Sequence, residues 1–242
     1  GIHSGDHSGN HDGLMRAVVL VGGFGTRLRP LTNSVPTPML PVGHRPMIAR
    51  LVDRLARGGV TEVVLALGFR PEPFIEAFPD ASFVYNEQYD QTNTSKSLMR
   101  ALQASTPGGV LWMNGDVVFD PTALERAALM VARDQSFVSV NTAKVSDEEV
   151  KYTTDAEGFI KELSKTVTGG LGEAVGINYI SRNDKAVLLR QLKRVGDQDY
   201  FERGIELAIE QDGILIEPVD ISDLYAVEVD FAEDLERANL FV

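Results

Sequence analysis

The sequence predicts an α/β fold with a mixed, mostly parallel sheet that is doubly wound, with helices on both faces. From Met15 onward, short apolar runs rich in β-branched residues alternate with amphipathic stretches of helical period. Strands that alternate with helices in this way usually lie parallel in one sheet. After residue 141 the pattern changes to two half-polar runs around a tight turn, which predicts a β-hairpin inserted into the sheet.

Each element of the first half has a local signal. RAVVLV (16–21) is short, β-branched and followed by glycines, as expected of a buried strand. A helix is expected over residues 46–59, from Pro46 to the Gly58-Gly59 pair. Asp120 and Pro121 are expected as the N-cap and first residue of another helix. The remaining elements are strands over 61–69, 81–86 and 110–113, and a helix over 97–104.

The second half completes one domain, expected over residues 14–242. The hairpin turns at Asp155–Gly158; strands are expected over 136–141, 173–180, 214–220 and 224–230, and helices over 182–194, 199–211 and 231–240. This order predicts a Rossmann-like sheet with a small hairpin and helical insertion.

Residues 1–13 are glycine, serine, histidine and aspartate without apolar periodicity, so we expect a disordered or artificially added tail.

Composition excludes several classes of function. The net charge of −12 argues against nucleic-acid binding, which needs a basic face. The chain has no cysteine, so disulfides and thiolate metal sites are excluded. No apolar run is long enough to cross a membrane and no signal peptide is visible, which favours a cytoplasmic protein. A polyanionic substrate would need a local cluster of basic residues acting against the overall charge.

A glycine-rich loop follows the first strand, within LVGGFGTRLRPLTNSVPTPMLPVGHRPM (20–47). Ligands of open α/β sheets bind beyond the carboxyl ends of the strands, where this loop lies. Glycines let backbone N–H groups approach an anion, and an arginine fork matches phosphate oxygens. The spacing matches neither the P-loop nor the dinucleotide-binding motif, so from the residues alone a simple turn with surface arginines remains an alternative.

Two aspartates occupy similar positions after other strands. Asp116 follows the strand VLWM, and Asp230 follows the strand that ends in VEV. Carboxylates at neighbouring strand ends can hold a divalent cation, while single aspartates there are often turn residues or helix caps. The residues alone leave both interpretations open.

The segments GGFGTRLRPLT and VPTPMLPVGHRPMI resemble the signature of the sugar-phosphate nucleotidyltransferases, with a dense match over residues 16–70. The resemblance implies transfer of a nucleoside monophosphate from an NTP to the phosphate of a small acceptor, with Mg²⁺ and release of pyrophosphate. It implies a nucleotide loop formed by Leu20, Gly22, Gly23, Gly25, Thr26 and Arg27. Arg27 would clamp the triphosphate and stabilise charge on the attacked α-phosphate.

The resemblance also implies roles for residues further along the chain. Asp116 and Asp230 match the metal pair, and Lys165 matches the lysine that binds the acceptor's phosphate. Arg27, Asp116 and Lys165 are therefore the expected catalytic residues. Asn86, Gln91 and Thr94 fall in the base-reading loop. Glu173, Asn178, Tyr200 and Glu202 are candidates for the acceptor pocket. The alternative for Glu173 and Asn178 is that they are polar positions on a strand with one face in water.

The resemblance changes subfamily along the chain. The first 80 or so residues are similar to mannose-1-phosphate guanylyltransferases, and the chain from NEQYDQTNTSKSLMRAL onward is similar to phosphocholine-type cytidylyltransferases. Natural divergence or a spliced chain would produce this change. It favours CTP with a phospho-alcohol or sugar phosphate; a hexose-1-phosphate guanylyltransferase is the alternative within the class. A nucleotide-binding regulator without activity is the alternative of another class, and assembly into a homo-oligomer is compatible with all three.

Two positions depart from the family pattern. The family usually has lysine between the prolines of the second segment, and here Thr37 occupies that position. Loss of a charged hydrogen bond in a catalytic site typically lowers the rate ~10²–10³-fold. Either another cation, Arg29 or Lys165, replaces the charge, or the chain is slow or inactive. The sugar subgroup usually has glutamate before the acceptor lysine, where this chain has Ser164, which weakens a clamp on sugar hydroxyls.

Overall fold

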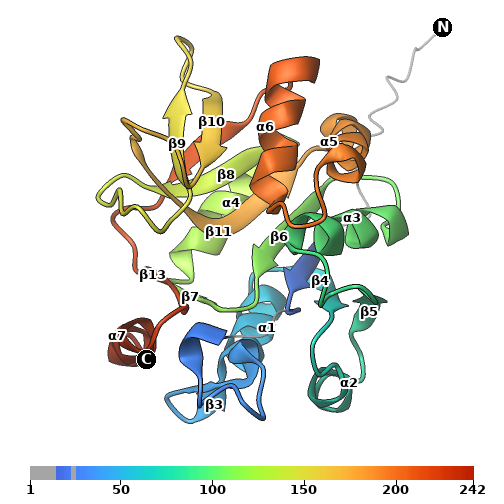
Figure 1. Cartoon of the computed structure of the whole chain (residues 1–242), viewed down its shortest axis with the longest axis vertical. Helices are drawn as coiled ribbons and strands as arrows, with labels where there is room; N and C mark the ends of the chain where they lie inside the picture. Colours follow the sequence, from blue (N-terminus) through green and yellow to red (C-terminus); the bar gives the residue numbers. More distant parts are fainter. Residues whose placement is uncertain (1–14, 23–25) are drawn as a thin grey trace, which may run out of the picture.

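The computed structural model describes residues 15–22 and 26–242 (Figure 1). The expected tail, Gly23 and Gly25 lie outside the described residues. In the described part, nine strands form the main sheet in the order β10-β9-β11-β6-β1-β4-β5, with β8 paired to β11 and β12. They are β1 Met15–Leu20, β4 Val60–Leu67, β5 Ser82–Tyr85, β6 Val110–Asn114, β8 Phe137–Asn141, β9 Lys151–Thr154, β10 Ile160–Ser164, β11 Gly172–Ile180 and β12 Glu217–Asp220.

The remaining elements surround this sheet. Two small antiparallel sheets pair β2 (Pro41–Val42) with β3 (Arg45–Pro46), and β7 (Val117–Phe119) with β13 (Ala226–Glu228). The helices are α1 Met47–Arg57, α2 Glu72–Ala77, α3 Thr94–Ala104, α4 Thr122–Ala132, α5 Arg182–Arg194, α6 Phe201–Asp212 and α7 Ala232–Leu240, with 3₁₀ turns at Thr26–Leu28 and Thr37–Met39. Among the helices of the described residues, none is long and apolar enough to span a bilayer.

The predicted fold class is confirmed. Strands β6, β1, β4 and β5 are parallel neighbours, and β8 and β12 are also paired in parallel. Strand β11 runs antiparallel to β6, β8 and β9, so it marks where the parallel part of the sheet meets the β9–β10 hairpin. The expected hairpin around Asp155–Gly158 is therefore an extension of the main sheet (Figure 1).

Both faces of the sheet are covered by helices, which is the doubly wound arrangement. Alternate side chains of β1 enter two different cores, because successive residues of a strand point to opposite faces. Ala17 and Val19 pack in the core under α1, α2 and α4; Val18 and Leu20 pack in the core under α3, α5 and α6. This explains why the strand reads as a continuous apolar run without alternation.

A third, smaller core packs residues near the C-terminal end of the described chain against the segment that follows β1. Leu28, Leu40 and Val42, from the segment after β1, pack with Val118 of β7 and Val227 of β13. Val229 belongs to the same core, so the residue before Asp230 is held against the segment that carries Arg27. These contacts join positions about 200 residues apart, and they position the cavity described below.

Several boundaries differ from those expected. Helix α3 begins at Thr94, because the Asn93 side chain accepts a hydrogen bond from the Thr94 N–H at 2.8 Å. Helix α4 begins at Thr122, with Asp120 accepting from the Thr122 N–H at 2.9 Å. Strand β12 starts at Glu217 rather than 214. Helix α2 and strand β7 were not expected: α2 has only six residues, and β7 is a strand only through pairing with distant β13.

We predict that Leu98→Ala lowers the free energy of unfolding by about 2–5 kcal/mol, because the Leu98 side chain is fully buried under α3. Leu129→Ala on α4 is the matched control: that side chain is 69% exposed, so a change within about 0.5 kcal/mol is expected. Urea denaturation of both variants checks this. Equal losses would contradict the placement of α3 against the sheet.

Candidate active site

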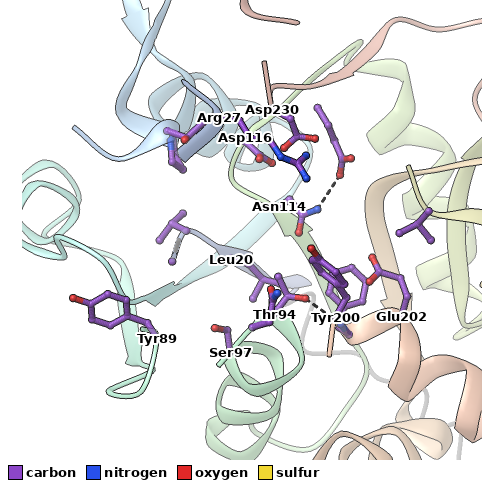
Figure 2. Close-up of a pocket in the computed structure, with 18 of the residues that line it drawn as sticks. Leu20, Arg27, Tyr89, Thr94, Ser97, Asn114, Asp116, Tyr200, Glu202 and Asp230 are labelled. Atoms are coloured by element: carbon purple, nitrogen blue, oxygen red, sulfur yellow. Dashed lines mark hydrogen bonds between the residues drawn. The ribbon is translucent and has the colours of Figure 1, made fainter. Parts of the chain in front are cut away.

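A cavity of about 550 Å³ opens at the carboxyl ends of β1 and β6 (Figure 2). Its walls come from separate parts of the chain: residues 20–22, 27–28 and 37–38, residues 86–97 before and within α3, residues 114–116, 148–150 and 165, and residues 198–202 and 228–230. In a parallel sheet, this edge collects the loops that follow neighbouring strands. The cavity therefore lies where the sequence places a ligand.

Most of the predicted site residues line this cavity, namely Leu20, Gly22, Arg27, Asn86, Thr94, Asp116, Lys165 and Asp230. Tyr200 and Glu202 line it too, as does Thr37. Gly23 and Gly25 lie outside the described residues, and Thr26 is described only as the start of a 3₁₀ turn. The structure does not bring Gln91, Glu173 and Asn178 to the cavity wall.

Burial on both faces of β11 explains the position of two of these residues. Glu173 and Asn178 are both buried, so neither lies on a face of the sheet open to water. Glu173 accepts a hydrogen bond from the Ser146 hydroxyl at 3.0 Å, and Asn178 pairs in register with Trp112 of β6. Gln91 is exposed, and its backbone carbonyl accepts a hydrogen bond from the Gln198 side chain.

Carboxylates form the most unusual group in the cavity. Glu149, Glu228 and Asp230 each offer one oxygen within 4.8 Å of the other two. Asp116 lines the same cavity, and its Oδ1 is buried without a hydrogen-bond partner. Burial and the charge of Asp230 raise the pKa of Asp116 from 3.8 to about 7. Burial and the charges of Asp116 and Asp230 raise the pKa of Glu228 well above its usual range.

These carboxylates fit a divalent cation. Mg²⁺ takes oxygen ligands, and a bound cation would offset the mutual repulsion that raises these pKa values. The predicted pair Asp116 and Asp230 is thus part of a larger group. Sequence reasoning missed Glu228, although it stands two residues before Asp230 in an extended segment, and so on the same side. It also missed Glu149, which comes from a loop with no local signal.

Two cations line the described cavity wall, and both lie over aromatic rings. The Arg27 guanidinium carbon is 5.1 Å from the centroid of Phe231. The Lys165 ammonium is 4.5 Å from the centroid of Tyr200 and 3.3 Å from its hydroxyl. Burial raises the pKa of Asp230, while Arg27 acts in the opposite direction. Arg29 is exposed and does not line the cavity, which leaves Lys165 as the candidate to replace the charge missing at Thr37.

Asn86 organises the loop before α3. Its amide donates to Thr92 Oγ1 at 2.8 Å and to Ser97 Oγ at 3.2 Å, and its carbonyl oxygen accepts from the Gln88 N–H at 3.2 Å. Both amide hydrogens are therefore used within the loop. The expected contact with a nucleobase would fall to the remaining lone pair of the carbonyl oxygen and to neighbouring hydroxyl and backbone groups.

A smaller cavity of about 170 Å³ adjoins the first. Lys165, Tyr200 and Glu202 line both, and Ser164 and Glu206 contribute to the smaller one. The Glu202 Oε2 is buried without a hydrogen-bond partner, and burial raises the pKa of Glu202 to about 7. Acidic side chains thus lie next to the cation that is expected to hold an acceptor's phosphate.

Comparison with known proteins agrees with this geometry. A family model described as "Nucleotidyl transferase" matches residues 16–152, more than half of the chain. The chain belongs to this family. It carries the residues of the glycine-rich loop, the 86–97 loop and Asp116 within the matched part. The sugar-phosphate nucleotidyltransferase resemblance is thereby confirmed.

The sequence relatives cover only part of the chain. It is 51% identical over 72 residues to a mannose-1-phosphate guanyltransferase of Schizosaccharomyces pombe, which is 30% of this chain and 20% of the relative. It is 36% identical over 116 residues to the corresponding protein of Debaryomyces hansenii, or 44% of this chain and 32% of the relative. The chain thus spans about a fifth to a third of these relatives' length.

Solved structures match nearly the whole chain at low identity. The inositol-1-phosphate CTP transferase from T. maritima has a TM-score of 0.80 and 17% identity, covering 94% of this chain and 95% of that one. The CTP:phosphocholine cytidylyltransferase from Streptococcus pneumoniae has a TM-score of 0.77 and 16% identity, covering 94% and 99%. At these identities the likeness establishes the fold.

Because the pKa of Asp116 is raised in the folded protein, we predict that the free energy of unfolding decreases as the pH rises. In metal-free buffer the folded protein keeps a proton on Asp116 up to about pH 7, while the unfolded chain loses it near 3.8. The folded state binds more protons across this window, so the free energy of unfolding decreases as pH rises through it. Relative to Asp116→Asn, the wild type should lose at most a few kcal/mol between pH 4 and 7.

Thermal unfolding with EDTA across pH 3–8 measures this difference. Asp223 serves as a control whose effect on the free energy of unfolding has the opposite pH dependence. Its bidentate pairing with Arg126 lowers its pKa to about 2. The stabilisation from Asp223 is present above pH 4 and is lost as pH falls toward 2. If the stability of the wild type follows that of Asp116→Asn at every pH, burial and the charge of Asp230 do not raise the pKa of Asp116.

Proposed function

We propose that the protein transfers a nucleoside monophosphate from an NTP to the phosphate of a small acceptor and releases pyrophosphate. The observation that carries this proposal is the combination of two cations, Arg27 and Lys165, with a cluster of carboxylates in one cavity. Two polyanions can approach each other only if their charge is offset, and this cavity contains the groups that do so.

In this reaction a phosphate oxygen of the acceptor attacks the α-phosphorus of the NTP. The bond between the α-phosphorus and the bridging oxygen breaks, and pyrophosphate leaves with the electron pair. The chain needs no covalent intermediate; it contributes positioning and charge. Arg27 would donate hydrogen bonds to the triphosphate and stabilise charge at the α-phosphate. Lys165 would hold the acceptor's phosphate, with its ammonium oriented by Tyr200.

We propose Mg²⁺ as the cofactor, held by Asp116, Glu228 and Asp230, with Glu149 at the same cluster. When bound there, Mg²⁺ would supply positive charge that offsets the charge developing on the phosphates during transfer. The buried Oδ1 of Asp116, which has no hydrogen-bond partner, is a free ligand position.

CTP with a phospho-alcohol or sugar phosphate is the favoured substrate pair. The resemblance of residues 86–102 to cytidylyltransferases supports CTP, and two structural neighbours that cover most of the chain are named for the use of CTP. A hexose-1-phosphate guanylyltransferase is the second candidate. It is favoured by the 51% identity over 72 residues to a mannose-1-phosphate guanyltransferase. A binding protein without activity is favoured only by Thr37.

Pyrophosphate release from pairs of CTP, GTP, UTP or ATP with phosphocholine, inositol 1-phosphate or mannose 1-phosphate tests the proposal. We expect turnover with CTP and a phospho-alcohol in MgCl₂, and none in EDTA. Asp230→Asn should lower the rate at least ~10²-fold, since it removes a metal ligand. Asp223→Asn, an exposed aspartate paired with Arg126, should keep wild-type activity. If no pair turns over but nucleotides raise the melting temperature, the protein is a binding protein.

Thr37→Lys tests the missing charge. Thr37 borders the cavity, so a lysine there would reach the phosphates, and a rate increase of ~10²–10³ is expected if charge is limiting. Thr37→Met, of similar length without charge, is the control and should not increase the rate. Steady-state kinetics measure both. An unchanged rate in Thr37→Lys would mean that Arg27 and Lys165 already provide sufficient charge.

A further inference from the structure

Three helix ends meet between the nucleotide side and the acceptor side of the cavity: the start of α3, the end of α5 and the start of α6 (Figure 1). Helix ends leave backbone N–H or C=O groups without partners inside the helix. Here these groups are paired with turn carbonyls and with the side chains of Thr94 and Lys96. The residues that pair them border the two halves of the proposed site.

The start of α3 is bonded to the turn that leads into α6, residues 196–200. The N–H of Asn93 donates to the carbonyl of Asp197 at 2.8 Å, and the N–H of Ser95 donates to that of Asp199 at 3.3 Å. In return, the N–H of Phe201, the first residue of α6, donates to the Thr94 hydroxyl at 3.0 Å. Thr94 was expected to contact the nucleotide; its oxygen also caps the acceptor-side helix.

The side chain of Lys96, on α3, binds the backbone at the end of α5. Its ammonium donates to the backbone carbonyls of Leu192 at 2.7 Å and Val195 at 2.9 Å, at the end of α5. The side chain is buried and does not line the cavity. Burying an ammonium is costly, and here carbonyl oxygens at a helix C-terminus stabilise it. Its position links α3 directly to the backbone that precedes the 196–200 turn.

We propose that Lys96 and Thr94 are positioning residues that make the 86–97 loop and the 196–202 turn a single cooperative unit. The functional consequence rests on the proposed function: a nucleotide held by the 86–97 loop would also order Tyr200 and Glu202, on the acceptor side. Nucleotide and acceptor would then bind with positive coupling. Couplings of this kind are typically about 5–150-fold in affinity.

The single tryptophan is a reporter of this unit. Trp112 of β6 packs edge-to-face on Phe201, with ring centroids 5.6 Å apart and an interplanar angle of 86°. Phe201 is the residue whose N–H is bonded to Thr94. A shift at the start of α6 therefore changes the surroundings of the indole.

The first experiment needs no ligand. Lys96→Met should speed amide hydrogen exchange in both segments, 86–97 and 196–205, because it frees the end of α5 and the start of α3 together. Lys96→Arg should restore part of the protection. Lys185→Met is the matched control: Lys185 joins the other ends of the same two helices, through Ser105 and the Thr106 carbonyl. It should leave both segments protected.

Faster exchange in only one segment, or in neither, would overturn the proposal. If Lys96→Met does not fold, Thr94→Val replaces it in the same experiment, since valine keeps the shape and loses only the oxygen that caps Phe201.

The second experiment adds MgCTP or MgGTP at saturation, with binding measured independently by calorimetry. In the wild type and Lys185→Met, the bound nucleotide should change Trp112 emission and tighten phosphocholine or mannose 1-phosphate at least ~5-fold. In Lys96→Met, the nucleotide should still bind, but it should neither change Trp112 emission nor tighten binding of the acceptor. A coupling unchanged by Lys96→Met would refute the proposal even in an active enzyme. Coupling without pyrophosphate release would keep the proposal and refute the transferase function.

Discussion

The crowding of half-buried carboxylates is the constraint on which the rest of the site depends. Asp116, Glu149, Glu228 and Asp230 come from three separate parts of the chain. Burial raises the pKa of each, and the charge of Asp230 raises the pKa of the other three further. Such a cluster persists only if the surrounding fold holds it. The β7–β13 pairing and the small core beneath it hold Glu228 and Asp230 in place.

The cations of the cavity are arranged so that their charge stays available. Under the proposed function, a protein of net charge −12 must bind polyanions, which requires that the cations of the cavity stay out of tight ion pairs. Arg27 and Lys165 each lie over an aromatic ring, which holds a cation without neutralising it. Lys96 is used differently: its buried ammonium donates to two backbone carbonyls at the end of α5 and so links two helices.

Local patterns allowed much of the fold to be predicted. The apolar run of β1, the turn at Asp155–Gly158 and the periodicity of α5 each depend on neighbouring residues, so their elements were correctly expected. Strand β7 and Glu149 were missed for the opposite reason. One is a strand only because it pairs with β13, and the other is a site residue only because a loop folds over the cavity.

The sequence by itself determined the fold class and the position of Gly22, Asp116 and Asp230 after strand ends, because strands and their ends are local properties. The tertiary structure alone decided which polar residues share the cavity. It added Glu149 and Glu228 to the carboxylates, and it placed Glu173 and Asn178 within a sheet covered on both faces. The reason is physical: burial, and the charge of a neighbour, depend on contacts between residues far apart in the chain.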